Sequence, residues 1–107
     1  MAAGLVLTLA ILTEVIGTVA LRYSEGFTRA VPSVVMVVAY ALSFYFLAIV
    51  LRQLPLGFVY AIWAGAGTAL VALIGMVALG EAVSVLKIVG LALVIAGVVS
   101  LNLAGAH

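Results

Sequence analysis

Four long apolar runs, separated by short polar segments, limit what this chain can fold into more than any other feature of its sequence. The runs occupy residues 3–21, 31–51, 56–79 and 83–103, and each approaches the roughly 20 residues that a membrane-spanning α-helix needs. Hydrophobic residues make up 69% of the chain and charged residues 7%, which excludes an ordinary soluble domain. The sequence predicts an all-α integral membrane protein with four transmembrane helices in one domain, 1–107.

The scarcity of polar side chains narrows the possible partners. Four Lys and Arg residues and a net charge of +1 do not make the clustered basic face that binds phosphates, so we expect no nucleic-acid partner. The chain has no cysteine, which removes Cys-based zinc sites. Its one histidine, His107, ends the chain, where a disordered tail is a better interpretation than a metal ligand. We expect no metal and no other cofactor.

The residues around the runs bear on orientation. No Lys or Arg precedes the first run, which we interpret as a retained helix and not as a signal peptide. With four spans, Arg22, Arg29 and Lys87 fall on one side of the lipid bilayer and Arg52 on the other. The positive-inside rule favours the first side as cytoplasmic, but so small a difference would permit both orientations. Dual topology is therefore a prediction.

Four helices of this length make a small bundle with little room for a binding cavity of its own. The runs show no internal repeat, whereas many secondary transporters build their site between two inverted halves. A chain with one half could obtain the other from a second copy in the opposite orientation. We therefore expect the chain to form an oligomer, and an antiparallel dimer is one arrangement that the weak charge bias permits.

Glu14 lies near the middle of the first run, and no other charged residue lies so deep in any run. A charged side chain at the bilayer centre costs about 2.5–3.5 kcal/mol on insertion scales, so it indicates an ion, proton or ligand site. Small residues on the same helical face would let helices approach closely or leave room for a ligand. That face carries Leu7, Ala10, Ile11, Gly17, Thr18 and Leu21.

Two interpretations of Glu14 stay open on this reasoning. It could be a protonated acid that bonds a neighbouring helix and only aids packing. Because no Lys, Arg or His lies deep in a run, its partner could instead be a hydroxyl, a second Glu14 or a bound cation. A proton and a cation would then compete for one carboxylate, which is the logic of exchange.

Aromatic residues of the second and third runs indicate what such a cation would look like. Tyr40, Ser43 and Phe44 share one stripe, and Tyr60 and Trp63 share another. Ring faces attract cations, quaternary ammonium groups among them. The alternative is that these rings pack between helices or lie at the membrane surface.

Paired glycines mark two further places. Gly65 and Gly67 lie inside the third run, where they would weaken the helix and provide a hinge. Gly90 and Gly97 are seven residues apart on one face of the fourth run, which suits a close-packed seam between subunits. Packing within one chain would explain the second pair about as well.

Three stretches carry a family resemblance: AILTEVIGT at 10–18, SEGFTR at 24–29 followed by Pro32 and Ser33, and YAIWAGAG at 60–67. Through them the chain resembles the small multidrug resistance transporters along nearly its full length. Gly4 and Ala64 depart from the residues common in multidrug members, an aromatic and a serine. Ile16 stands where the guanidinium-exporting subtype has tryptophan, so the resemblance is to the multidrug branch.

The resemblance implies an antiparallel, dual-topology homodimer in the bacterial inner membrane that exports hydrophobic cations in exchange for protons and is not an enzyme. Glu14 of both subunits would be the shared proton and cation site. The glycines at 65 and 67 would be the hinge, and those at 90 and 97 the dimer interface. The residues implied to line the pocket are Leu7, Ala10, Ile11, Gly17, Thr18, Tyr40, Ser43, Tyr60 and Trp63, to which the aromatic stripe adds Phe44.

Other functions remain as alternatives. A guanidinium exporter of the same family would prefer guanidinium to bulky aromatic cations. A proton-conducting pore would dissipate a proton gradient without substrate, and a structural subunit of a larger membrane complex would be inert alone.

Overall fold

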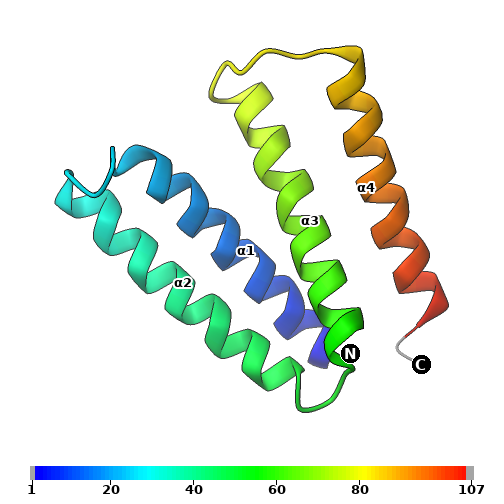
Figure 1. The fold of residues 1–107 in the computed structure, drawn as a ribbon. Helices are drawn as coiled ribbons and strands as arrows, with labels where there is room; N and C mark the ends of the chain where they lie inside the picture. The colour runs from blue at the N-terminus through cyan, green and yellow to red at the C-terminus, as the bar shows by residue number, and fades with distance from the viewer. Residues whose placement is uncertain (1, 106–107) are drawn as a thin grey trace. The chain divides into compact units, whose positions relative to one another are not determined.

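The computed structural model describes residues 2–105 and has four helices in that range (Figure 1). They are α1 (Ala2–Tyr23), α2 (Ala30–Val50), α3 (Leu56–Val77) and α4 (Val85–Ala104). Each is long and apolar enough to cross a membrane, so the predicted all-α class with four membrane-spanning helices is confirmed. His107 lies outside the described residues.

The chain divides between Leu54 and Pro55 into two compact units, and each unit is a helical hairpin. The first hairpin consists of α1 and α2, and the second of α3 and α4. Pro55 is the N-cap residue of α3, with φ −63° and ψ 144°. Its ring fixes that φ, and its lack of an N–H costs nothing where a helix begins. That the two hairpins form a single domain stays a prediction.

Small residues bring α1 and α2 of the first hairpin close together. The ring of Tyr40 on α2 lies against the backbone of Gly17 on α1, and the hydroxyl of Ser43 donates to the Ala10 carbonyl oxygen at 2.7 Å. Bulkier side chains at these places on α1 would hold the backbones apart. The buried residues of α1 are Leu7, Ala10, Ile11, Val15, Gly17 and Ala20.

A tight turn joins α1 to α2 and fixes their register. Ser24 is fully buried, and its hydroxyl donates to the Leu21 carbonyl oxygen at 2.7 Å and accepts from the Phe27 amide at 3.2 Å. Glu25, Gly26 and Phe27 have φ values of 50°, 72° and 68°. Only glycine takes this left-handed region without strain, so the Ser24 hydrogen bonds hold two residues in a costly conformation.

The ends of the second hairpin's helices differ slightly from the apolar runs. The third run extends to 79, but α3 ends at Val77 and the chain reverses through Gly80 with φ 71°. The fourth run begins at 83, but Ser84 is extended and its hydroxyl caps α4 by accepting from the Lys87 amide at 3.2 Å. An apolar run reports membrane depth, whereas caps set where a helix starts and stops.

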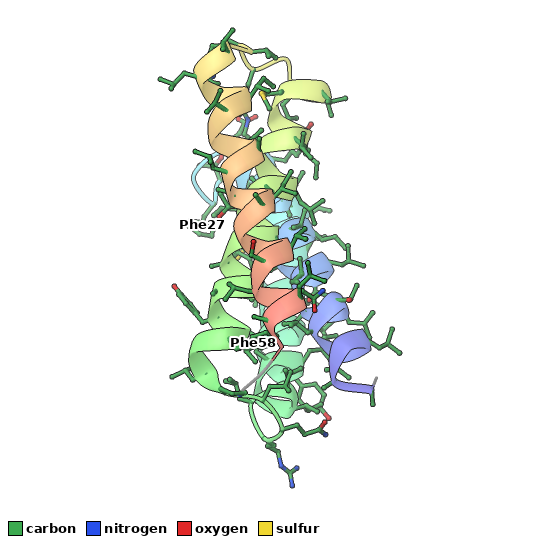
Figure 2. All side chains as sticks on the ribbon, turned by 90° about the vertical axis from the view of Figure 1, so that its right-hand side faces the viewer. Phe27 and Phe58 are labelled. Carbon is green, nitrogen blue, oxygen red and sulfur yellow. The ribbon has the colours of Figure 1, made fainter. Side chains whose placement is uncertain are left out.

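The helix α4 is the most exposed of the four. It contains no buried residue along Val85–Ala104, and Figure 2 shows side chains of carbon alone along most of it. Outside the helices, Phe27, labelled in Figure 2, is an exposed ring in the turn after α1. A whole helix of exposed apolar side chains requires lipid or another protein surface around it.

Candidate functional site

Glu14 lies on α1, and the structure places its side chain partly buried. The nearest charged residue on α1 is Arg22, eight residues further along, which is about 12 Å of helical rise. The partner helix α2 contains no Asp, Glu, Lys, Arg or His. Within the first hairpin, the carboxyl group of Glu14 therefore lies in an apolar helix pair without a nearby basic side chain on α1 or α2.

A short chain of hydroxyl groups meets the Glu14 carboxylate. The Thr18 hydroxyl donates to Glu14 Oε2 at 2.9 Å, and the Thr18 hydroxyl oxygen lies 2.7 Å from the Tyr40 phenolic oxygen. Thr18 also lies 3.0 Å from the Glu14 backbone carbonyl oxygen. Glu14 and Thr18 are one helical turn apart, so the helix itself sets their contact, whereas Tyr40 reaches them from α2.

Gly17 makes room for Tyr40. A Cβ atom at position 17 would lie 2.5 and 2.6 Å from two carbon atoms of the Tyr40 ring, closer than non-bonded carbon atoms approach. Tyr40 is partly buried, as is Thr18. A glycine one residue before Thr18 thus lets the aromatic ring approach α1 closely enough to bring its hydroxyl to that of Thr18.

The other predicted pocket residues of the first hairpin differ in exposure. Leu7, Ala10 and Ile11 are buried, and Ser43 is 1% exposed with its hydrogen donated to Ala10. Phe44 is 60% exposed. The structure therefore brings Glu14, Thr18 and Tyr40 together, uses Ser43 to join the helices, and leaves Phe44 on an open surface of α2.

Tyr60 and Trp63 lie together on α3 of the second hairpin. Their ring centroids are 5.8 Å apart at an interplanar angle of 45°, a tilted arrangement that aromatic pairs favour. Tyr60 is 60% exposed and Trp63 is partly buried. The predicted stripe on the third run thus presents one open ring beside one half-covered ring.

The predicted hinge and seam glycines have distinct surroundings. The α-helix α3 continues through Gly65 and Gly67 without interruption. A Cβ atom on Gly65 would lie 2.7 Å from Val98 Cγ2, so this glycine also lets α4 approach α3, a role that sequence reasoning missed. Gly90 and Gly97 have nothing within 4 Å of where their Cβ atoms would be. Their hinge and interface roles stay predictions.

Sequence reasoning also gave no role to a cavity between α3 and α4. Its volume is about 390 Å³, and its lining includes the acid Glu81 of the connecting segment and the base Lys87 of the first turn of α4. The Lys87 amino group donates to the Ala82 carbonyl oxygen at 2.7 Å. The residues that line it are Thr68, Ala72, Met76, Glu81, Lys87, Gly90, Leu91 and Val94. Among residues 2–105, no three His, Cys, Asp or Glu side chains gather where they could hold a metal ion.

Comparison with known proteins finds relatives along nearly the whole chain. The sequence model of the family described as Small Multidrug Resistance protein matches residues 3–94. The chain is 48% identical over 104 residues to the multidrug resistance protein mmr of Mycolicibacterium paratuberculosis, covering 96% of this chain and 97% of that one.

Two further relatives carry names that point to different cations. The quaternary ammonium compound-resistance protein QacF of Klebsiella aerogenes is 47% identical over 97 residues, covering 91% of this chain and 88% of that one. A guanidinium exporter of Yersinia pestis is 43% identical over 102 residues, covering 95% and 98%. Identity alone therefore does not separate the two kinds of relative.

Proposed function

Because the chain belongs to the small multidrug resistance family, we propose that it exports hydrophobic, aromatic or quaternary ammonium cations from the cell in exchange for protons. Its four apolar helices and its relatives identify it as a multi-pass protein of the bacterial inner membrane. Transport changes no covalent bond of the cargo, so the protein would not be an enzyme.

The observation that carries this proposal is the Glu14 carboxyl group in an apolar helix pair. Its bonded partner is the Thr18 hydroxyl, and the nearest basic residue on α1 or α2 is Arg22, eight residues along the helix. An acid in the hydrocarbon region is costly unless it is protonated or neutralised. A bound proton and a bound cation are the two ways to achieve this, and they exclude each other at one oxygen pair.

Exchange follows if two copies of Glu14 share one site across an antiparallel homodimer. A cation binds to the ionised carboxylates, so its binding requires that the acids release their protons, and protons that bind from the other side release the cation. Two protons moving against one monovalent cation would transfer one net charge. The two acids would titrate as a coupled pair, so their apparent proton affinities belong to the site.

Aromatic rings would supply the rest of the affinity. Tyr40 beside Glu14, and Tyr60 and Trp63 on α3, offer ring faces to a cation. Such contacts contribute about 0.5–2 kcal/mol each, depending on how well water is excluded. This favours flat or bulky hydrophobic cations, which cover ring faces, over small hydrated ones.

The second hairpin supports the proposed dimer. Along α4 the apolar side chains are exposed, and Gly90 and Gly97 leave an open strip on one face. Helices associate in lipid through close packing of small residues, so this strip suits contact with a second copy. Alternating access would then follow from rocking of the two subunits, with Gly65 and Gly67 as the hinge.

Guanidinium export is the second candidate, because one relative bears that name at 43% identity. Ile16, at the position that distinguishes the subtypes, is 54% exposed on α1. A small planar ion can stack on an aromatic ring, but it covers less apolar surface than a bulky aromatic cation does, so we place guanidinium second.

Uptake into proteoliposomes under an imposed pH gradient tests the proposal. We expect proton-driven transport of tetraphenylphosphonium and ethidium in preference to guanidinium, and its loss in Glu14→Gln. Glu25→Gln is the matched control, because Glu25 lies exposed in the turn after α1. Equal transport by Glu14→Gln would contradict the proposal, a preference for guanidinium would support the second candidate, and a proton leak without substrate would indicate a pore.

A further inference from the structure

Three oxygen atoms surround one hydroxyl group in the first hairpin. The Thr18 hydroxyl oxygen lies 2.9 Å from Glu14 Oε2, 3.0 Å from the Glu14 carbonyl oxygen and 2.7 Å from the Tyr40 phenolic oxygen. Thr18 has one hydrogen to donate and two lone pairs with which to accept. Which oxygen receives the Thr18 hydrogen therefore depends on which neighbouring oxygens carry a hydrogen of their own to donate.

The ionised state of Glu14 permits one arrangement. A carboxylate and a backbone carbonyl oxygen accept hydrogen bonds and cannot donate, so the Thr18 hydrogen turns toward Glu14. The contact at 2.7 Å between Thr18 and Tyr40 then requires Tyr40 to be the donor. The hydrogens point in one direction, from Tyr40 to Thr18 to Glu14.

Protonation of Glu14 at Oε2 breaks this arrangement. The acid then carries a hydrogen that faces Thr18, and two hydrogens do not fit between the same two oxygens. Glu14 becomes the donor, and the Thr18 hydrogen turns to the Glu14 carbonyl oxygen or to Tyr40. An acid protonated at Oε1 instead can still accept from Thr18 at Oε2, but more weakly than a carboxylate does. The bond from Thr18 at 2.9 Å is therefore strongest in the ionised form and favours that form.

The geometry points to Thr18 as a positioning residue that holds the Glu14 carboxylate ready for a cation, with Tyr40 acting behind it as the donor to Thr18. The assignment rests on the exchange function proposed above and deepens it. Thr18 would tip the competition between proton and cation toward the cation. Tyr40, with its hydrogen turned inward, would offer the cation its ring face and oxygen lone pairs but no donor.

Few other groups in the first hairpin can influence this competition. The titratable side chains of α2, the helix packed against α1, are Tyr40 and Tyr45. Tyr45 is 62% exposed and pairs with Phe46 at 5.9 Å. On α1 the remaining ones are Arg22 and Tyr23 at its end. In the proposed dimer the second Glu14 adds to them, so a measured midpoint belongs to the pair.

The test is the pH profile of tetraphenylphosphonium binding to the full-length protein in lipid bicelles, measured by calorimetry. Removing the Thr18 hydroxyl in Thr18→Val should move the midpoint of binding to higher pH by about one pH unit, since a hydrogen bond to a charged group is worth at least that much. Tyr40→Phe should give a smaller shift in the same direction. The double variant should shift no further than Thr18→Val, because Tyr40 acts through Thr18.

Matched variants separate this role from packing. Thr18→Ser keeps the hydroxyl and should restore the wild-type midpoint. Thr13→Val removes a hydroxyl that bonds only to carbonyl oxygens of its own helix, Leu9 and Ala10, and Tyr45→Phe removes an exposed phenol on α2. Both controls should leave the profile unchanged.

A second readout serves if a variant no longer binds the probe. Infrared spectra of protein with ¹³C-labelled glutamate report the ionised carboxylate directly, and subtraction of the Glu14→Gln spectrum isolates Glu14 from Glu25 and Glu81. The carboxylate band should grow in at higher pH in Thr18→Val than in the wild type.

The possible outcomes distinguish a failure of the Thr18 role from a failure of the proposed proton–cation exchange. A pH-dependent wild type with an unchanged profile in Thr18→Val would overturn the role of Thr18 and leave exchange intact. The same would follow if Thr18→Ser shifted as far as Thr18→Val. Binding of tetraphenylphosphonium that does not vary with pH in the wild type would overturn both.

Discussion

The two hairpins of this chain are built on different principles. In the first, α1 and α2 both bury residues, and hydrogen bonds from Ser43 to Ala10 and between Tyr40 and Thr18 cross between the helices. In the second, α3 buries residues but α4 buries none. The first hairpin thus positions polar groups through specific contacts of its own, whereas the second presents an apolar surface that something else must cover.

This difference gives the two hairpins different expected roles, one in holding a polar site and the other in contact between subunits. Specific hydrogen bonds in an apolar setting fix the position of a carboxyl group, as they do for Glu14. In a membrane the hydrophobic effect does not drive an exposed apolar helix toward another helix, because lipid tails are equally apolar. Such a helix associates where small residues, like the glycines of α4, permit close contact. We therefore expect substitutions in the first hairpin to affect binding and stability, and those on the open face of α4 to affect assembly.

Gly17→Ala should have the largest effect on the stability of the first hairpin. Its Cβ atom would meet the Tyr40 ring at 2.5 Å, and overpacking of this kind costs about 1–3 kcal/mol. The measurement is the free energy of unfolding in mixed detergent and dodecyl sulfate micelles. Gly4→Ala is the control, because nothing lies within 4 Å of that position on the same helix. Equal stability of the two variants would mean that the Tyr40 contact is not tight.

Gly97→Leu should weaken the dimer while leaving each hairpin stable. Nothing lies within 4 Å of the missing Cβ atom, so a side chain at this position starts in open space and points away from the rest of its own chain. We expect a loss of about tenfold in the dimerisation constant, equivalent to about 1.4 kcal/mol, measured by energy transfer between labelled subunits in liposomes. Ala92→Leu, exposed on the opposite side of α4, is the control. A dimer that tolerates Gly97→Leu would place the interface elsewhere.

Gly65→Ala should destabilise the second hairpin by about 1 kcal/mol. The new methyl group would lie 2.7 Å from Val98 Cγ2, a single contact, compared with several Tyr40 ring atoms near Gly17. Valine is stiff at χ1 in a helix, so α4 itself must move away. Thermal unfolding in detergent measures this, with Gly57→Ala, which meets nothing within 4 Å, as the control. Equal stability of Gly65→Ala and Gly57→Ala would mean that Gly65 is not needed for the close approach of α4, so that only its predicted hinge role would remain.

Ser43→Ala should have the smallest effect, about 0.6 kcal/mol of stability, which is the average for hydrogen bonds between membrane helices. It removes the donor to the Ala10 carbonyl oxygen at 2.7 Å. Ser100→Ala is matched to it, because Ser100 bonds only within α4. Dodecyl sulfate titration should show a lower free energy of unfolding for Ser43→Ala than for Ser100→Ala. The largest measured value for such hydrogen bonds is about 1.7 kcal/mol. A loss above about 2 kcal/mol would therefore mean that the first hairpin depends on Ser43 for more than this hydrogen bond.

Local spacing was enough to predict much of the fold and part of the site. The apolar runs of bilayer length predict the four helices, since length and hydropathy decide which segments can cross a membrane. Glu14 and Thr18 share a helical face because they are four residues apart, and the structure joins them by a hydrogen bond. These features depend on one helix at a time.

The features that the sequence does not predict are contacts between two helices, which depend on how the helices are aligned with each other. Helical spacing predicts that Tyr40 lies on a substrate stripe, but its contact with Thr18 requires the turn at 24–29, whose left-handed residues no helical pattern predicts. Spacing predicts Gly17 as a small pocket residue, and the structure adds that it admits the Tyr40 ring. Spacing predicts Gly65 as a hinge, whereas its approach to Val98 depends on how α4 packs against α3.

The central claim is that protons and cations compete for Glu14. The most direct measurement is the number of protons released into weakly buffered solution when tetraphenylphosphonium binds to the purified protein in bicelles. We expect that binding to the wild type releases protons at low pH and progressively fewer as the pH rises, and that Glu14→Gln releases none. Binding without proton release at any pH, or release that persists in Glu14→Gln, would contradict it.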